Sequence, residues 1–124
     1  MYNIPFSDIN AKHIDGDWVV ESRQLSTSDP AAVIARALRF IFDKDNFLLL
    51  VPEAQGNWAL EVEESMKRPY LNINVLNNSW KALITRLFIN TDTKDTRLNL
   101  YFDTGVELTL IKVLNQPTGF SSKK

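Results

Sequence analysis

The chain has 124 residues, 44% of them hydrophobic, and contains no cysteine. This length suits one domain with one hydrophobic core, and the lack of cysteine excludes disulfide bonds and thiolate metal ligands. The 14 basic residues nearly balance the 15 acidic ones, so the formal net charge is only -1. Because such a chain has no strong long-range field, we expect no nucleic-acid partner.

The first segment, residues 1–15, predicts an N-terminal arm or a single helical turn. It has neither a basic stretch nor a continuous apolar run, and it is therefore unlike a secretory signal peptide. We expect a cytoplasmic protein, with an exported mature form as the alternative if a leader was trimmed. No stretch of the sequence approaches the roughly 20 apolar residues that cross a bilayer, so we expect no membrane span.

A first strand is predicted over residues 18–25, followed by one short helix. Asp29 is a suitable N-cap and Pro30 suits the first helical position. The apolar stripe of this helix would consist of Val33, Ile34, Ala37 and Leu38.

From residue 38 onward the apolar residues alternate with others, which is typical of strands. We predict strands over residues 38–42, 47–51, 58–63 and 70–75. The first two form a hairpin closed by Phe42 and Phe47. The last two each have one apolar and one polar face, so we expect them to pair with one face toward water.

Residues 79–90 fit two patterns. A helical stripe would be formed by Trp80, Leu83, Ile84, Leu87 and Phe88, with Ser79 as the N-cap. The β-rich surroundings and the β-branched residues favour a strand with a bulge instead. We adopt the strand and keep the helix as the alternative.

The final hairpin, within residues 96–114, has the clearest pattern. A three-residue loop, Asp103-Thr104-Gly105, with Gly105 at positive φ places all the apolar residues of both strands on one face. The resulting pairs are Phe102 with Val106, Leu100 with Leu108, and Leu98 with Leu110. A two-residue turn would oppose apolar to polar residues, so we predict the longer loop. Residues 116–124 are expected to form a flexible tail.

These elements predict a mainly β fold in a single domain, 1–124. About eight strands at short, regular spacing are typical of an antiparallel up-and-down meander that closes into a small barrel, here with the short helix between the first two strands.

The segment Gly16-Asp17-Trp18 resembles the Gly-x-Trp element that opens the first strand of lipocalins. In that family the tryptophan closes one end of the barrel beneath a basic side chain from the last strand, and Lys112 is the matching residue. The resemblance implies a lipocalin-like barrel with a cation–π contact of about 0.5–2 kcal/mol between Lys112 and Trp18. The chain departs from the family in using lysine instead of arginine. It also has Lys112-Val113-Leu114 where fatty-acid-binding relatives have an Arg-x-Tyr pair.

Few residues in the chain suggest covalent chemistry. His13 is the only histidine, so neither a zinc site with several nitrogen or sulfur ligands nor an obvious histidine-assisted nucleophile is present. We expect a protein that is not an enzyme and that has no metal and no cofactor.

The barrel interior is the expected binding site, for a small apolar or amphipathic molecule. Its predicted lining residues are Phe40, Phe42, Trp58 and Arg86. If the face of Trp80 and Ile84 points inward, Arg86 lies inside and needs an anion, such as a ligand carboxylate or an internal acidic residue. If Leu83 and Leu87 point inward, Arg86 is external.

The alternative function is a packed β-rich interaction module, because the aromatic residues can fill a small barrel instead of lining a cavity. Ile41, Leu48 and Leu50 add a second apolar face on the early hairpin. Such a face predicts cover by the short helix or a homodimer contact.

Overall fold

The computed structural model describes residues 2–25, 36–44, 46–50 and 53–113. Two short N-terminal helices, η1 (Phe6–Asp8) and α1 (Ala11–Ile14), precede the main run of strands. The nine strands are β1 (Tyr2–Asn3), β2 (Gly16–Leu25), β3 (Arg39–Asp43), β4 (Asn46–Leu50), β5 (Ala54–Glu63), β6 (Arg68–Val75), β7 (Asn78–Ile89), β8 (Thr96–Phe102) and β9 (Val106–Lys112).

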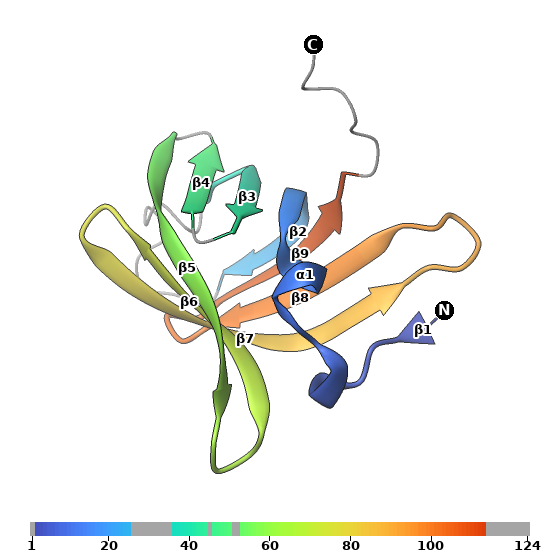
Figure 1. Cartoon of the computed structure of the whole chain (residues 1–124). Coiled ribbons are helices and arrows are strands. Elements are labelled where there is room, and N and C mark those ends of the chain that lie inside the picture. Colours follow the sequence, from blue (N-terminus) through green and yellow to red (C-terminus); the bar gives the residue numbers. More distant parts are fainter. Residues whose placement is uncertain (1, 26–35, 45, 51–52, 114–124) are drawn as a thin grey trace.

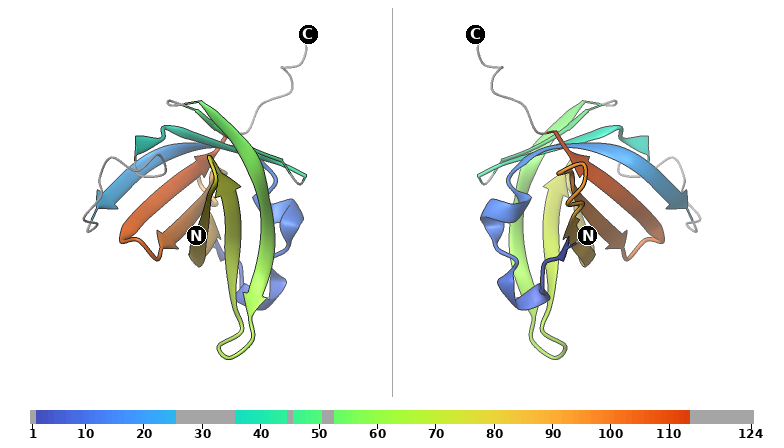
Figure 2. Two further views of the ribbon diagram at one scale, coloured as in Figure 1. Left: turned by 90° about the vertical axis from the view of Figure 1, so that its left-hand side faces the viewer. Right: turned by 90° about the vertical axis from the view of Figure 1, so that its right-hand side faces the viewer.

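Strands β2 to β9 form a closed antiparallel barrel in meander order. Each strand pairs with the next along the chain, and β9 pairs back onto β2, so the eight strands form a ring (Figures 1 and 2). β1 adds a short ninth strand beside the C-terminal part of β7. The predicted mainly β meander barrel is therefore confirmed.

The helices η1 and α1 lie before the first barrel strand. The N-terminal arm was predicted to contain a helical turn, and α1 forms there, with its N-cap Asn10 accepting a hydrogen bond from the Lys12 backbone at 2.9 Å. The helix predicted between the first two barrel strands falls largely in residues 26–35, outside the described part. None of the described helices is long and apolar enough to cross a membrane.

The ambiguous segment after residue 78 is a strand. β7 pairs with β6 through its N-terminal half and with β8 through its C-terminal half, and its register shifts between Ile84 and Arg86. The apolar residues of β7 have a helix-like spacing because the bulge changes, halfway along the strand, which residues face inward.

The β8–β9 hairpin has the predicted register, with Phe102 opposite Val106 and Leu98 opposite Leu110. Gly105 adopts φ +95°, and its N–H bonds to the Phe102 carbonyl at 2.9 Å. The three-residue loop is confirmed, because only this loop length places both apolar series on the inner face.

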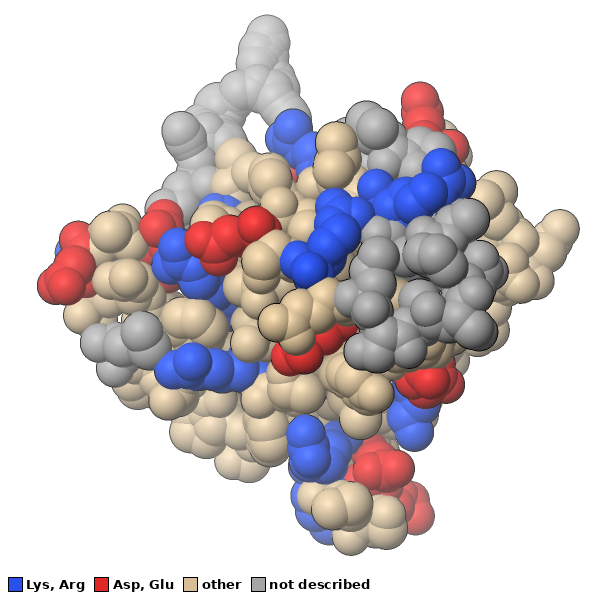
Figure 3. Space-filling view, turned by 180° about the vertical axis from the view of Figure 1, so that it is seen from behind, with Lys and Arg blue, Asp and Glu red and all other residues tan. Residues whose placement is uncertain are grey.

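The core fills the barrel with apolar side chains, and none of the described buried side chains is polar or charged. The largest fully buried ones are Trp18, Phe40, Phe42, Phe47 and Phe102. Charged residues of both signs are interspersed on the face seen in Figure 3, consistent with the near-zero net charge. The described residues of that face therefore form no large patch of one sign.

Candidate functional site

Three of the predicted ligand-binding residues meet in the barrel interior, where they contact one another. Phe40 and Phe42 are fully buried and Trp58 is 6% exposed. The ring of Phe42 lies 5.1 Å from the rings of both Phe47 and Trp58, measured between centroids, and Phe40 lies 5.6 Å from Phe47. Edge-on and tilted contacts at these distances are favourable aromatic packing. These aromatic side chains therefore occupy this part of the barrel interior by packing against one another.

Trp18 and Lys112 meet at the end of the barrel beside α1. Lys112 Nζ lies 5.2 Å from the centre of the Trp18 ring and donates a hydrogen bond to the His13 carbonyl at 3.1 Å. The Trp18 indole N–H bonds to the Ile14 carbonyl at 2.8 Å. Burial lowers the pKa of the Lys112 ammonium, and the nearby Asp15 carboxylate partly offsets this. Both barrel residues thus hold the C-terminal end of α1.

Arg86 lies outside the interior, contrary to our expectation. Ile84 and Leu87 both belong to the core, so the bulge residue Thr85 shifts the alternation and turns Arg86 to the outer face. There its guanidinium lies 4.1 Å from the centre of the Phe88 ring, and its Nε donates to Asn3 Oδ1 at 2.9 Å. The physical reason is the bulge, which reverses the facing of every later residue of β7.

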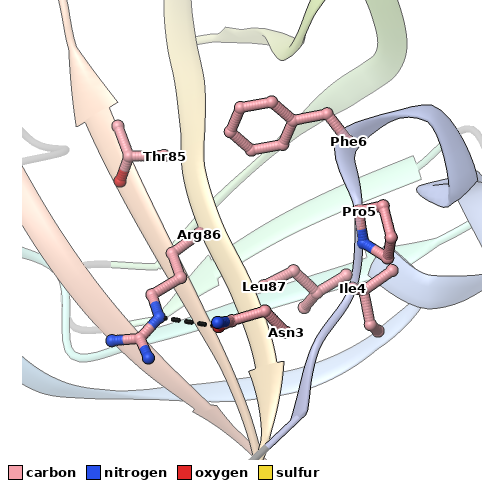
Figure 4. A pocket seen from close by; sticks show the side chains of 7 residues that line it. All are labelled: Asn3, Ile4, Pro5, Phe6, Thr85, Arg86 and Leu87. Atoms are coloured by element: carbon pink, nitrogen blue, oxygen red, sulfur yellow. Dashed lines mark hydrogen bonds between the residues drawn. The ribbon is translucent and has the colours of Figure 1, made fainter.

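A pocket of about 320 Å³ lies beside Arg86, between the N-terminal segment and β7 (Figure 4). We call it the β1–β7 pocket. Ile4, Pro5 and Phe6 approach it from the N-terminal segment, and Thr85 and Arg86 border it from β7. Asn3 and Leu87 complete its lining.

The pocket exists because two strands share one edge of β7 without meeting. β6 pairs with β7 as far as Leu83, and β1 pairs with β7 only at Phe88 and Ile89. The next contact with the N-terminal segment is a bond from the Ile4 N–H to the Leu87 carbonyl at 2.8 Å. The bulge at Thr85 lies in the part of β7 between the residues paired with β6 and those paired with β1. The pocket lies beside this part of the barrel wall.

The lining of the pocket is chemically asymmetric. Four of its lining residues are apolar, Ile4, Pro5, Phe6 and Leu87, whereas Arg86 is its one cation and none of its described lining residues is acidic. The Phe6 ring also contacts a second cation, because the Arg68 guanidinium carbon lies 5.1 Å from the centre of this ring. Such a site suits a molecule with an apolar body and an anionic group.

The second apolar face predicted on the early hairpin is only partly described. Ile41 is half-buried, and the side chains of Leu48 and Leu50 lie outside the described part. The homodimer contact through these three residues stays a prediction. Among the described residues, no group of three or more histidine, aspartate or glutamate side chains is arranged to hold a metal ion.

The comparisons with protein-family models, with curated proteins and with solved structures found no match for this chain. What the structure supports of the resemblance to lipocalins is the closed eight-stranded antiparallel meander.

The contribution of the N-terminal arm to this pocket was not predicted from the sequence. The apolar residues Ile4 and Phe6 of the arm were the available signal, because apolar side chains outside a strand pattern need a surface to pack on. Which surface they use depends on the pairing of Tyr2–Asn3 with β7, and the sequence of the arm carries no register information for so short a strand.

Proposed function

We propose that the protein is a non-catalytic binding protein whose ligand is a small amphipathic anion, held in the β1–β7 pocket. One observation carries the proposal: a single guanidinium, that of Arg86, borders a pocket whose other described lining residues are mainly apolar. Its volume of about 320 Å³ is near the lower end of the usual range for ligand sites, which suits a small aromatic or short aliphatic acid.

Arg86 is suited to recognising the anionic group. Its bond to Asn3 and its stacking on Phe88 fix the plane of the guanidinium. A planar, permanently charged guanidinium matches the geometry of a carboxylate or sulfonate. The apolar body of the ligand would lie against Phe6 and Pro5.

The finer relationship to lipocalins is part of the same proposal. The Gly16-Asp17-Trp18 segment and the position of Lys112 over the Trp18 ring support it. In this proposal the ligand lies beside the wall of a lipocalin-like barrel, because Phe40, Phe42 and Trp58 pack against each other or against Phe47 in the interior.

Two fluorescent dyes test the proposal. Anilinonaphthalene sulfonate carries an anion, and N-phenylnaphthylamine is its uncharged analogue. Arg86→Gln should weaken binding of the sulfonate about tenfold, in line with the loss of a charge-assisted hydrogen bond, and leave binding of the neutral dye unchanged. Phe6→Ala should weaken both dyes, because both use the apolar lining.

The matched control is Arg39→Gln, which removes a surface guanidinium paired with Asp17 outside the pocket. It should change neither dissociation constant. Equal loss of both dyes in Arg86→Gln, or no loss of either dye in Phe6→Ala, would contradict the proposal.

A further inference from the structure

One long free edge of the barrel lies on β5. β5 pairs with β4 only over Ala54–Asn57, whereas it pairs with β6 as far as Glu63. Among the described residues, the stretch from Trp58 to Glu63 thus has no strand partner on the β4 side. Figure 1 shows this part of β5 extending past the β3–β4 hairpin and facing α1.

A groove of about 440 Å³ runs along this free edge, and we call it the β5 groove. It is lined by Ile9, Asn10, Ala11, Lys44, Trp58, Ala59, Leu60 and Val62. None of these residues lines the β1–β7 pocket, so the two sites are separate. Val62 is 57% exposed, which is high for an apolar side chain in a strand.

An unpaired strand edge presents main-chain N–H and C=O groups at every second residue, and such a row is a template for another strand. The edge from Trp58 to Glu63 spans about 20 Å, enough for a short extended segment. This unpaired stretch of β5 is longer than the two-residue strand β1.

We propose that the β5 edge binds an extended segment of another protein by strand addition, with apolar side chains facing the β5 groove and basic side chains facing outward. This proposal does not depend on ligand binding in the β1–β7 pocket. The apolar preference follows from Leu60 and Val62, which lie on the groove side. The basic preference follows from Glu61 and Glu63 on the opposite face of β5.

The charges also indicate which end of an added antiparallel strand would carry the basic residues. Glu61 accepts a hydrogen bond from the Tyr70 hydroxyl and Glu63 lies 3.6 Å from Lys81, yet both glutamates stay partly exposed to an incoming cation. Lys44 lines the groove near the opposite, Trp58 end. An antiparallel segment with its basic residues toward its N-terminus places them beside the two glutamates and away from Lys44.

A second copy of this chain is a poor occupant of the edge. Two β5 strands paired antiparallel through this stretch would bring Glu61 and Glu63 of both copies onto one face. Like charges on neighbouring strands are destabilising. The partner is therefore a different chain that carries the complementary charge.

A labelled peptide, Lys-Val-Lys-Val-Thr-Val with blocked ends, tests the proposal by fluorescence anisotropy. We expect saturable binding with one peptide per chain. Methylating alternate backbone nitrogens on the pairing edge should weaken binding at least tenfold, because it removes the main-chain donors and leaves the charge unchanged. Glu61→Lys should weaken binding to a similar extent, whereas the exposed Glu53→Lys should not.

Several results would overturn the inference. These are no saturable binding, equal binding of the methylated peptide, or equal effects of Glu61→Lys and Glu53→Lys. A concentration-dependent dimer of the free protein that Val62→Lys abolishes would assign the edge to a second copy instead. Dye binding in the β1–β7 pocket is measured on the same variants, so failure of one proposal is separable from failure of the other.

Discussion

Lys112 and Trp18 are joined through the same short helix as well as through direct contact. The ammonium lies 5.2 Å from the centre of the indole ring, while the two side chains bond to the adjacent carbonyls of His13 and Ile14. Carbonyl groups at the end of a helix lack partners within the helix, and here two barrel side chains satisfy them. The last and first barrel strands thereby fix α1 on the end of the barrel.

Trp18→Phe should lower the free energy of unfolding by about 2–4 kcal/mol, because it removes the bond to the Ile14 carbonyl and leaves space in the core. The measurement is urea denaturation followed by circular dichroism. Trp80→Phe is the matched control: the Trp80 indole N–H is buried without a hydrogen-bond partner, so its removal should cost less than about 1 kcal/mol. Equal losses in the two variants would contradict the assigned role of the Trp18 N–H.

Lys112 should make stability depend on pH in the alkaline range. Burial lowers its pKa in the folded protein, so between that value and the pKa in the unfolded chain the unfolded state binds more protons. The contribution of Lys112 to the free energy of unfolding therefore rises as pH increases through this interval and is constant below it. Comparing denaturation curves of the wild type and Lys112→Met across alkaline pH measures this contribution.

In Lys112→Met the rise with pH should be absent. Lys12→Met, an exposed lysine of α1, should keep the wild-type dependence. A contribution from Lys112 that decreases with rising pH would show that its ammonium is stabilised by its surroundings, contrary to the direction expected from burial.

Phe102 and Tyr101 test the inward and outward alternation of β8. Phe102 is fully buried, whereas Tyr101 is 43% exposed. Phe102→Ala should lower the free energy of unfolding by about 3–5 kcal/mol, as deletion of a core aromatic ring does, and Tyr101→Ala by less than about 1 kcal/mol. Thermal and urea denaturation measure both losses, and a larger loss for Tyr101→Ala would contradict the barrel register.

The parts of the fold that were predictable from sequence are those with local causes. The β8–β9 register follows from one glycine and the alternation on each side of it, and the hairpin of β3 and β4 follows from Phe42 opposite Phe47. In both hairpins the strands are close in sequence. The turn therefore limits the choice of register to a few alternatives, and the hydrophobic pattern selects one of them.

The candidate site was less predictable. Trp58, Phe40 and Phe42 were correctly expected to face inward, but their mutual packing depends on the barrel diameter and on Phe47 from the neighbouring strand. The contact between Asn3 and Arg86 was not predictable from the sequence, because 83 residues separate them and only the two-residue strand β1 brings them together.

The sequence alone determined the hairpins β3–β4, β5–β6 and β8–β9, because period-two alternation and turn residues are local properties of the chain. The tertiary structure alone decided the facing of Arg86, the position of the N-terminal arm and the free edge of β5. The facing of Arg86 depends on the bulge in β7, where the register of its pairing with β8 shifts. The position of the N-terminal arm and the free edge of β5 depend on how far each neighbouring strand extends in the closed barrel. The extent of each strand is set by the whole barrel and not by its local sequence.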